Sequence, residues 1–172
     1  MNILLIGMPG SGKTRIGRIL AEKLNRKFID VDDFILEQTG KDSAEHLAEL
    51  GDDEFLQFEA QLVQKIKTKD AIIATSGSVP LVEEGMNFLK KNAFAVWLRP
   101  SLEFIEKRIA KRRDGSSRIV GMQTRTIAEI LQWRESEYQR HQDTILEIKS
   151  EMPKEEVAER LIDLLHEQKV IN

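Results

Sequence analysis

The chain has 172 residues, of which 41% are hydrophobic and 32% are charged, and its formal net charge is −3. This length and composition predict one domain with a real core, and the mildly acidic balance gives no sign of a nucleic-acid or anionic membrane partner. The sequence contains no cysteine, which excludes disulfides, thiolate catalysis and cysteine-bound zinc.

Short apolar runs alternate along the chain with longer segments of helical periodicity. The predicted strands are residues 2–6, 27–29, 71–74, 93–98 and 144–148. The predicted helices are residues 13–24, 34–67 with breaks at Gly40 and Gly51, 81–90, 102–113, 126–142 and a final helix that Pro153 opens. This alternation predicts an α/β fold, a single-domain three-layer sandwich with a five-stranded parallel sheet flanked by helices.

The first strand is followed by "GMPGSGKT", residues 7–14, which matches the phosphate-binding pattern G-x-x-x-x-G-K-[ST]. Glycines let backbone N–H groups turn toward phosphate oxygens, and the helix N-terminus adds partial positive charge. We expect Lys13 to contact the β- and γ-phosphates of a nucleotide and the Thr14 hydroxyl to bind Mg²⁺. The alternative is a glycine-rich turn that binds nothing. The predicted nucleotide contacts are Gly10, Ser11, Gly12, Lys13, Thr14 and Arg15.

The second strand ends in "FIDVDDF", which contains Asp30, Asp32 and Asp33. In extended backbone Asp30 and Asp32 share a face and point into the crevice at the carboxyl end of the sheet. One carboxylate can hold a Mg²⁺-bound water, and the other can orient and deprotonate an acceptor hydroxyl. The alternative is an acidic N-cap before a helix at Phe34, and Asp33 is the favoured cap.

Three later segments add candidate site residues. The turn "ATSGSVP" contains Gly77 and offers backbone N–H groups and hydroxyls, although it is equally well read as a flexible turn. Arg118 lies within the glycine- and serine-rich stretch of "KRRDGSSR", where it predicts a lid that closes over the nucleotide. For Lys111 and Arg112 a solvated basic helix end is favoured. Arg134, in "LQWRESEYQR", could face the crevice.

The ordered set of motifs resembles the shikimate kinase family of P-loop proteins over roughly residues 1–148. The resemblance rests on "GMPGSGKT", "FIDVDDFILEQTGK", "GDDEFLQFE", "ATSGSV", "SSRIVG" and "RESEY". It implies ATP as the donor, Mg²⁺ as the metal and a small-molecule hydroxyl on a carboxylated ring, such as shikimate, as the acceptor. It also implies a substrate-binding helical segment at about 33–67 and a lid at about 112–125.

The resemblance assigns roles to individual residues of this sequence. It implies that Thr14 and Asp30 serve the metal, and that Lys13, Asp32 and Arg118 are catalytic. Arg118 is also implied as a nucleotide contact from the lid. The implied acceptor contacts are Asp32, the backbone of Gly77, and Arg134, which would bind a carboxylate.

The sequence departs from the family pattern on the acceptor side. Leu56 follows Phe55 where the family usually has arginine, and Ser76 and Ser78 flank Gly77 where a glycine triplet is usual. The lid reads "RIVG" in place of Arg-Pro and leucines, and Arg15 stands where a small hydroxyl residue is common. We therefore rank phosphorylation of shikimate first, a different small hydroxylated acceptor second, and nucleotide binding without acceptor chemistry third.

The expected setting is that of a cytoplasmic enzyme. No apolar run approaches the roughly 20 residues that span a bilayer, and the N-terminus lacks the basic region of a signal peptide. We expect a monomer that binds no nucleic acid and no membrane. As a shikimate kinase, it would serve aromatic amino acid biosynthesis.

Overall fold

A computed structural model describes residues 1–111, 119–149 and 152–172. Within them, five parallel strands form one sheet in the order β2-β3-β1-β4-β5. The strands are β1 (Asn2–Ile6), β2 (Lys27–Asp30), β3 (Ala71–Ala74), β4 (Ala93–Pro100) and β5 (Thr144–Ile148). β1 is central because Leu4 pairs with Ile73 of β3 on one side and with Ala95 of β4 on the other. The predicted α/β fold with a five-stranded parallel sheet is confirmed.

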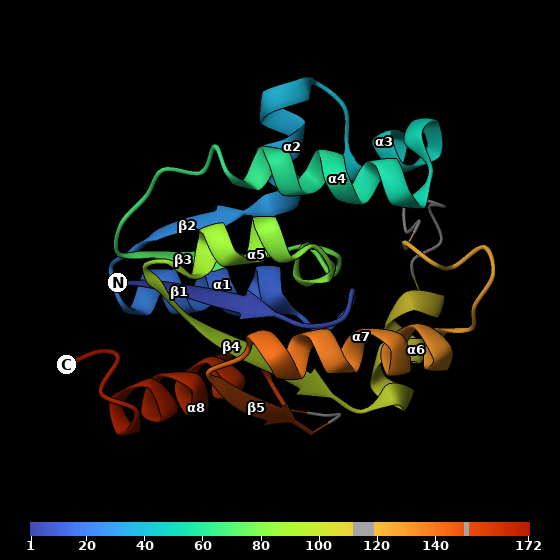
Figure 1. Cartoon of the computed structure of the whole chain (residues 1–172). Coiled ribbons are helices and arrows are strands. Elements are labelled where there is room, and N and C mark those ends of the chain that lie inside the picture. The colour runs from blue at the N-terminus through green and yellow to red at the C-terminus, as the bar shows by residue number, and fades with distance from the viewer. Residues whose placement is uncertain (112–118, 150–151) are drawn as a thin grey trace.

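Helices connect the strands and cover both faces of the sheet (Figure 1). The elements are α1 (Lys13–Lys23), α2 (Val31–Thr39), α3 (Ser43–Leu50), α4 (Asp52–Val63), the 3-10 turn η1 (Val79–Leu81), α5 (Glu83–Lys90), α6 (Leu102–Ala110), α7 (Ile127–His141) and α8 (Lys154–Glu167). None of the helices in these described ranges combines the length and apolarity that crossing a membrane requires.

The side chains of β1 alternate between two hydrophobic layers, as the pleat of a strand requires. Ile3 and Leu5 pack with buried side chains of α1 and α8. Leu4 and Ile6 pack with buried side chains of α4, α5 and α7 on the opposite face. Because helices cover both faces, the strand is an uninterrupted apolar run, which is typical of parallel sheets.

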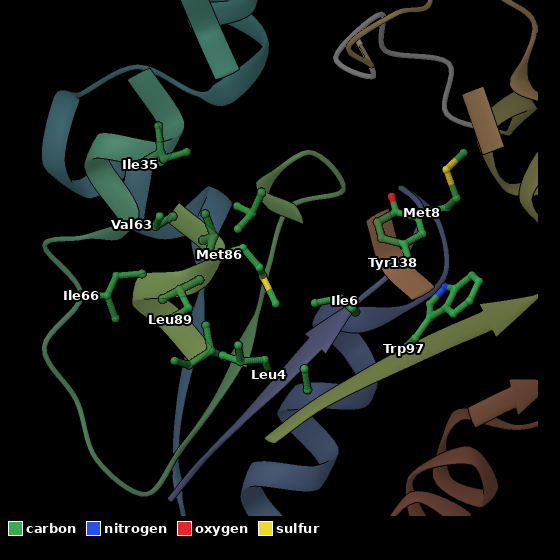
Figure 2. Packing of buried hydrophobic residues seen from close by; sticks show 14 of the residues in the cluster. Leu4, Ile6, Met8, Ile35, Val63, Ile66, Met86, Leu89, Trp97 and Tyr138 are labelled. Carbon is green, nitrogen blue, oxygen red and sulfur yellow. The ribbon is translucent and has the colours of Figure 1, made fainter. Parts of the chain in front are cut away.

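The phosphate-binding loop is fixed to one of these layers. Met8, within the loop, is 2% exposed and belongs to the same cluster as Trp97 and Tyr138. Figure 2 shows Met8 close to Tyr138, with Trp97 of β4 below them. The loop is therefore held by core packing as well as by its own backbone.

The structure corrects the sequence-based boundaries at one functional place. α2 begins at Val31, three residues before the expected start, and its N-cap is Asp30, not Asp33. Asp32 consequently lies in the first turn of a helix, so the expectation that Asp30 and Asp32 share one face of an extended strand is wrong. The predicted breaks at Gly40 and Gly51 are confirmed, since both residues lie at helix boundaries with positive φ.

Candidate active site

A cavity of about 980 Å³ lies at the carboxyl ends of the parallel strands, where ligands bind in open α/β sheets. Its basic side consists of the phosphate-binding loop and α6, and contains Gly10, Gly12, Lys13, Thr14, Arg15, Lys107, Arg108 and Lys111. Its other side contains Asp32, Ser43, Phe55, Glu59, Ser76, Gly77, Ser78, Val120 and Arg134. The cavity therefore joins a cationic half to a half rich in hydroxyl and carboxyl groups.

The phosphate-binding loop has the backbone that its glycines permit. Gly10 has φ 85° and Gly12 has φ 99°, both in the left-handed region that other residues rarely adopt. The Nζ atom of Lys13 donates to the carbonyl oxygens of Gly7 at 2.8 Å and Met8 at 2.9 Å. These contacts fix the lysine ammonium at the start of α1.

The residues present fit a nucleotide polyphosphate. The Oγ of Ser11 is buried and has no hydrogen-bond partner among the described residues, and buried hydroxyls are ordinarily paired. Thr14 is exposed at the cavity on the first turn of α1, which places a hydroxyl where Mg²⁺ could be held. Lys111 also lines the cavity, although a solvated helix end was favoured for it from the sequence.

Asp32 lines the cavity from the first turn of α2. Its Oδ1 accepts a hydrogen bond from the Ser43 hydroxyl at 2.7 Å. Desolvation by the surrounding protein raises the pKa of Asp32, and the charges of Asp30 and Asp33 act in the same direction, while Ser43 and Lys13 oppose the shift. The carboxylate remains accessible from the cavity, so an acceptor hydroxyl can reach a base stronger than an ordinary aspartate.

Asp30 and Asp33 lie differently from Asp32. The Oδ1 of Asp30 accepts the backbone N–H of Asp32 at 2.9 Å, which caps α2. Asp30 is buried and is absent from the cavity lining. Its predicted role toward the metal would therefore be indirect, through the residues that separate it from the cavity. Asp33 also lines the cavity, and its exposed carboxylate pairs with Arg18 at 2.8 Å.

Gly77 lies where the phosphate-binding loop, α7 and the turn after β3 meet. A Cβ at Gly77 would stand 2.4 Å from Pro9 Cδ and 2.9 Å from an Arg134 terminal nitrogen, so no larger residue fits. The carbonyl oxygen of Gly77 accepts from Arg134 at 3.0 Å and from the Tyr138 hydroxyl at 2.8 Å. The turn is therefore rigidly held against α7, and is not a flexible connection.

Arg134 reaches the cavity from α7 but is 1% exposed. Its second terminal nitrogen donates to the carbonyl of Val120 at 2.9 Å, and its Nε is buried without a partner among the described residues. The next N–H after Val120, that of Gly121, donates to Asp52 at 2.8 Å. Arg134 thus joins the turn after β3 to the end of the predicted lid segment.

Glu59 is the residue that the sequence reasoning did not assign. It is 1% exposed and lines the cavity from α4. Its two carboxylate oxygens accept the hydroxyls of Ser76 at 2.6 Å and Ser78 at 2.7 Å. The signal was available in "GDDEFLQFE", because an acid at a buried position of a helix needs a partner, but the partners lie 17 and 19 residues away.

Burial raises the pKa of Glu59 from its ordinary 4.5 to about 7. The Asp32 charge adds to the rise, while the two serine hydroxyls and Arg134 limit it. A carboxyl in this range is partly protonated at neutral pH, so the Glu59 site can both accept and donate hydrogen bonds.

The raised pKa predicts that the stability of the wild-type protein falls as the pH rises from about 5 to 8. Between the unfolded pKa of 4.5 and the folded value of about 7, the folded protein keeps a proton that the unfolded chain releases. Raising the pH through this window therefore favours unfolding, by about 3 kcal/mol in total. Glu59→Gln removes the titrating group and should flatten this part of the profile. The check is urea unfolding of both proteins at several pH values; profiles with the same slope would contradict the prediction.

Leu56 does not line the cavity. It is half-buried and packs with Leu47, Phe55 and Val120 in a small cluster between α3, α4 and the end of the lid segment. The structure therefore places Leu56 in apolar packing and outside the cavity lining. Arg112 and Arg118 lie outside the described residues, so the lid arginine remains a prediction.

A phosphate-binding loop between a central parallel strand and a helix, opening into a cavity at the carboxyl edge of the sheet, is the arrangement of P-loop nucleotide-binding proteins. The shikimate kinase family model matches residues 9–166. The chain belongs to the shikimate kinase family of phosphotransferases.

Individual relatives fall into two groups. The chain is 35% identical over 162 residues to a shikimate kinase of Thermodesulfovibrio yellowstonii, covering 94% of this chain and 92% of that protein. It is 36% identical over 167 residues to threonine synthase-like 1 of Homo sapiens, covering 95% of this chain but 22% of that protein. The chain thus spans under a quarter of the length of that relative.

A solved structure agrees with the family assignment. Shikimate kinase from Acinetobacter baumannii in complex with shikimate superposes with a TM-score of 0.85 at 26% identity, covering 99% of this chain and 95% of that one. The fold is therefore shared over nearly the whole length of both chains.

Proposed function

We propose that this chain transfers the terminal phosphoryl group of ATP to a hydroxyl of a small hydroxylated molecule. The observation that carries the proposal is the presence of Asp32 and Lys13 in one cavity, each acting electrostatically on the other. The family supports ATP as the donor, and Thr14 and Asp30 are the proposed metal residues. Shikimate, which the Acinetobacter baumannii relative binds, is the first acceptor to test.

The chain's own residues suit each step of such a transfer. Asp32 takes the proton of the acceptor hydroxyl, the new oxygen–phosphorus bond forms, and the bond to the bridging oxygen of ADP breaks. The Lys13 ammonium and the loop N–H groups stabilise charge on the phosphate oxygens. Mg²⁺, when bound at Thr14, would neutralise further charge on the β- and γ-oxygens. Arg118 is the proposed lid arginine.

One specific observation favours the second candidate function, transfer to a small hydroxylated acceptor other than shikimate. The side chain that follows Phe55, Leu56, adds no cation to the cavity. A carboxylated ring would lack the bidentate guanidinium partner that carboxylates prefer at that place. The third candidate function is nucleotide binding without transfer. It gives no role to Asp32, whose raised pKa suits a base that accepts the proton of an acceptor hydroxyl.

We expect acceptor-dependent release of ADP when the chain is assayed with Mg-ATP and a panel of hydroxylated acids and polyols. The readout is the rate of ADP formation above the rate without acceptor, followed by mass spectrometry of the phosphorylated product. The Lys13→Ala variant is the control that should lose the signal. ADP release that no acceptor accelerates would refute the kinase proposal and leave the nucleotide-binding reading.

A further inference from the structure

The acceptor side of the cavity is dominated by carboxyl groups and hydroxyls. Asp32 and Glu59 face this half, together with the hydroxyls of Ser43, Ser76 and Ser78. Arg134 is the cation that lines this half in the described residues. Asp33 and Asp42 also line the cavity, and Asp33 pairs with Arg18. With Asp32 and Glu59 ionised, negative charge therefore exceeds the one positive charge of Arg134 on this side of the cavity.

Two of the five N–H groups of the single guanidinium are already engaged, and its Nε has no partner among the described residues. Each terminal nitrogen of Arg134 donates to a main-chain carbonyl, that of Gly77 or that of Val120. A carboxylate prefers two parallel N–H donors from one unobstructed fork. Arg134 instead connects the turn after β3 to Val120 through these hydrogen bonds. An added carboxylate would also be repelled by the negative charges of Asp32 and Glu59.

Two departures from the family pattern on the acceptor side are physically linked: Leu56, and the serines at 76 and 78. Residues 56 and 59 are three apart on α4 and so are neighbours on the helix surface, where an arginine at 56 could neutralise the Glu59 carboxylate. With Leu56 in that place, Glu59 would be a buried acid without a partner. The hydroxyls of Ser76 and Ser78 supply the missing donors, one to each carboxylate oxygen.

We infer that the acceptor subsite selects an uncharged polyhydroxylated ring, such as a cyclic polyol or sugar, over a carboxylated one. This inference rests on the proposed kinase function and names the substrate class of that same site. Ring hydroxyls can donate to Asp32, to Glu59 and to the lone pairs of the serine oxygens, whose own protons already go to the two carboxylates. Leu56, Glu59, Ser76 and Ser78 are the residues that set this selectivity.

The test compares shikimate with its methyl ester, which removes the negative charge and adds one methyl group, and uses myo-inositol as an uncharged polyol without that group. Binding is measured by titration calorimetry on the wild-type chain with a non-hydrolysable ATP analogue and Mg²⁺ present. We expect the ester to bind at least about tenfold more tightly than shikimate, the equivalent of one charge-assisted contact left unmade. Shikimate binding as tightly as the ester, or no binding of either uncharged probe, overturns the inference.

Leu56→Arg should reverse the order of the two probes. Leu56 lies behind Leu47 and Val120, which line the cavity, and the longer arginine can extend past them to the acceptor carboxylate. We expect this to tighten shikimate by about 10-fold to 150-fold and to leave the ester little changed. Leu56→Gln is the matched control, because it removes the same apolar side chain without adding charge. Melting temperatures of both variants detect a loss of fold, and the wild-type comparison stands without either variant.

The inference and the kinase proposal fail in different ways. If the ester binds more tightly than shikimate but no acceptor accelerates ADP release, the kinase proposal is wrong. The inferred preference of the cavity for an uncharged ring is then still supported. If shikimate rapidly releases ADP and the ester binds weakly, the inferred preference for an uncharged ring is wrong. The kinase proposal is then still supported.

Discussion

Asp32→Asn is expected to lower phosphoryl transfer by about 10²- to 10⁴-fold, the range typical of a lost acid–base group. Asparagine keeps the shape of the side chain and can still accept from the Ser43 hydroxyl, but it cannot take the acceptor proton. ATP affinity should stay close to wild type, because Asp32 lies on the acceptor side. Single-turnover transfer and nucleotide titration separate these two effects.

Asp33→Asn is the matched control for Asp32→Asn. It makes the same change of charge one residue away, at an exposed carboxylate that borders the cavity but already pairs with Arg18. Transfer by this variant should remain close to the wild-type rate. If Asp32→Asn also transfers at the wild-type rate, the acceptor role of Asp32 is wrong.

Lys13→Ala is expected to impair both nucleotide binding and turnover. The lost ammonium removes a charge-assisted contact to the phosphates, which corresponds to about 10-fold to 150-fold in ATP affinity. Removing one stabilising group from the transferring phosphoryl group lowers turnover by about 10²- to 10³-fold. Part of the loss comes from the loop, since Lys13 also ties the carbonyls of Gly7 and Met8.

Lys23→Ala provides the comparison for Lys13→Ala. It deletes a lysine from the other end of α1, where the ammonium pairs with Glu159 at 3.2 Å on the exposed surface. Nucleotide titration and melting temperature of both variants separate a loss of binding from a loss of fold. Wild-type ATP affinity in a folded Lys13→Ala protein would refute the phosphate contact.

The sequence predicted the sheet and its order of elements well, because both rest on local signals. The inner strands β1, β3 and β4 contain short apolar runs that are buried on both faces, and the helices carry the 3.6-residue period of one buried face. The boundary at Asp30 was missed because "DVDD" offers several capping side chains within a few residues. Which of them caps depends on where the chain leaves the sheet, and β2 pairs with β3 as far as Asp30.

The nucleotide half of the candidate site could be read from the sequence, because its residues are contiguous and glycine at positive φ is a local requirement of the loop. The acceptor half could not. Glu59 meets Ser76 and Ser78 across 17 and 19 residues, and Leu56 packs against Leu47 and Val120, which line the cavity although Leu56 itself does not. These contacts depend on how α4 rotates against the turn after β3, which the packing of distant segments decides.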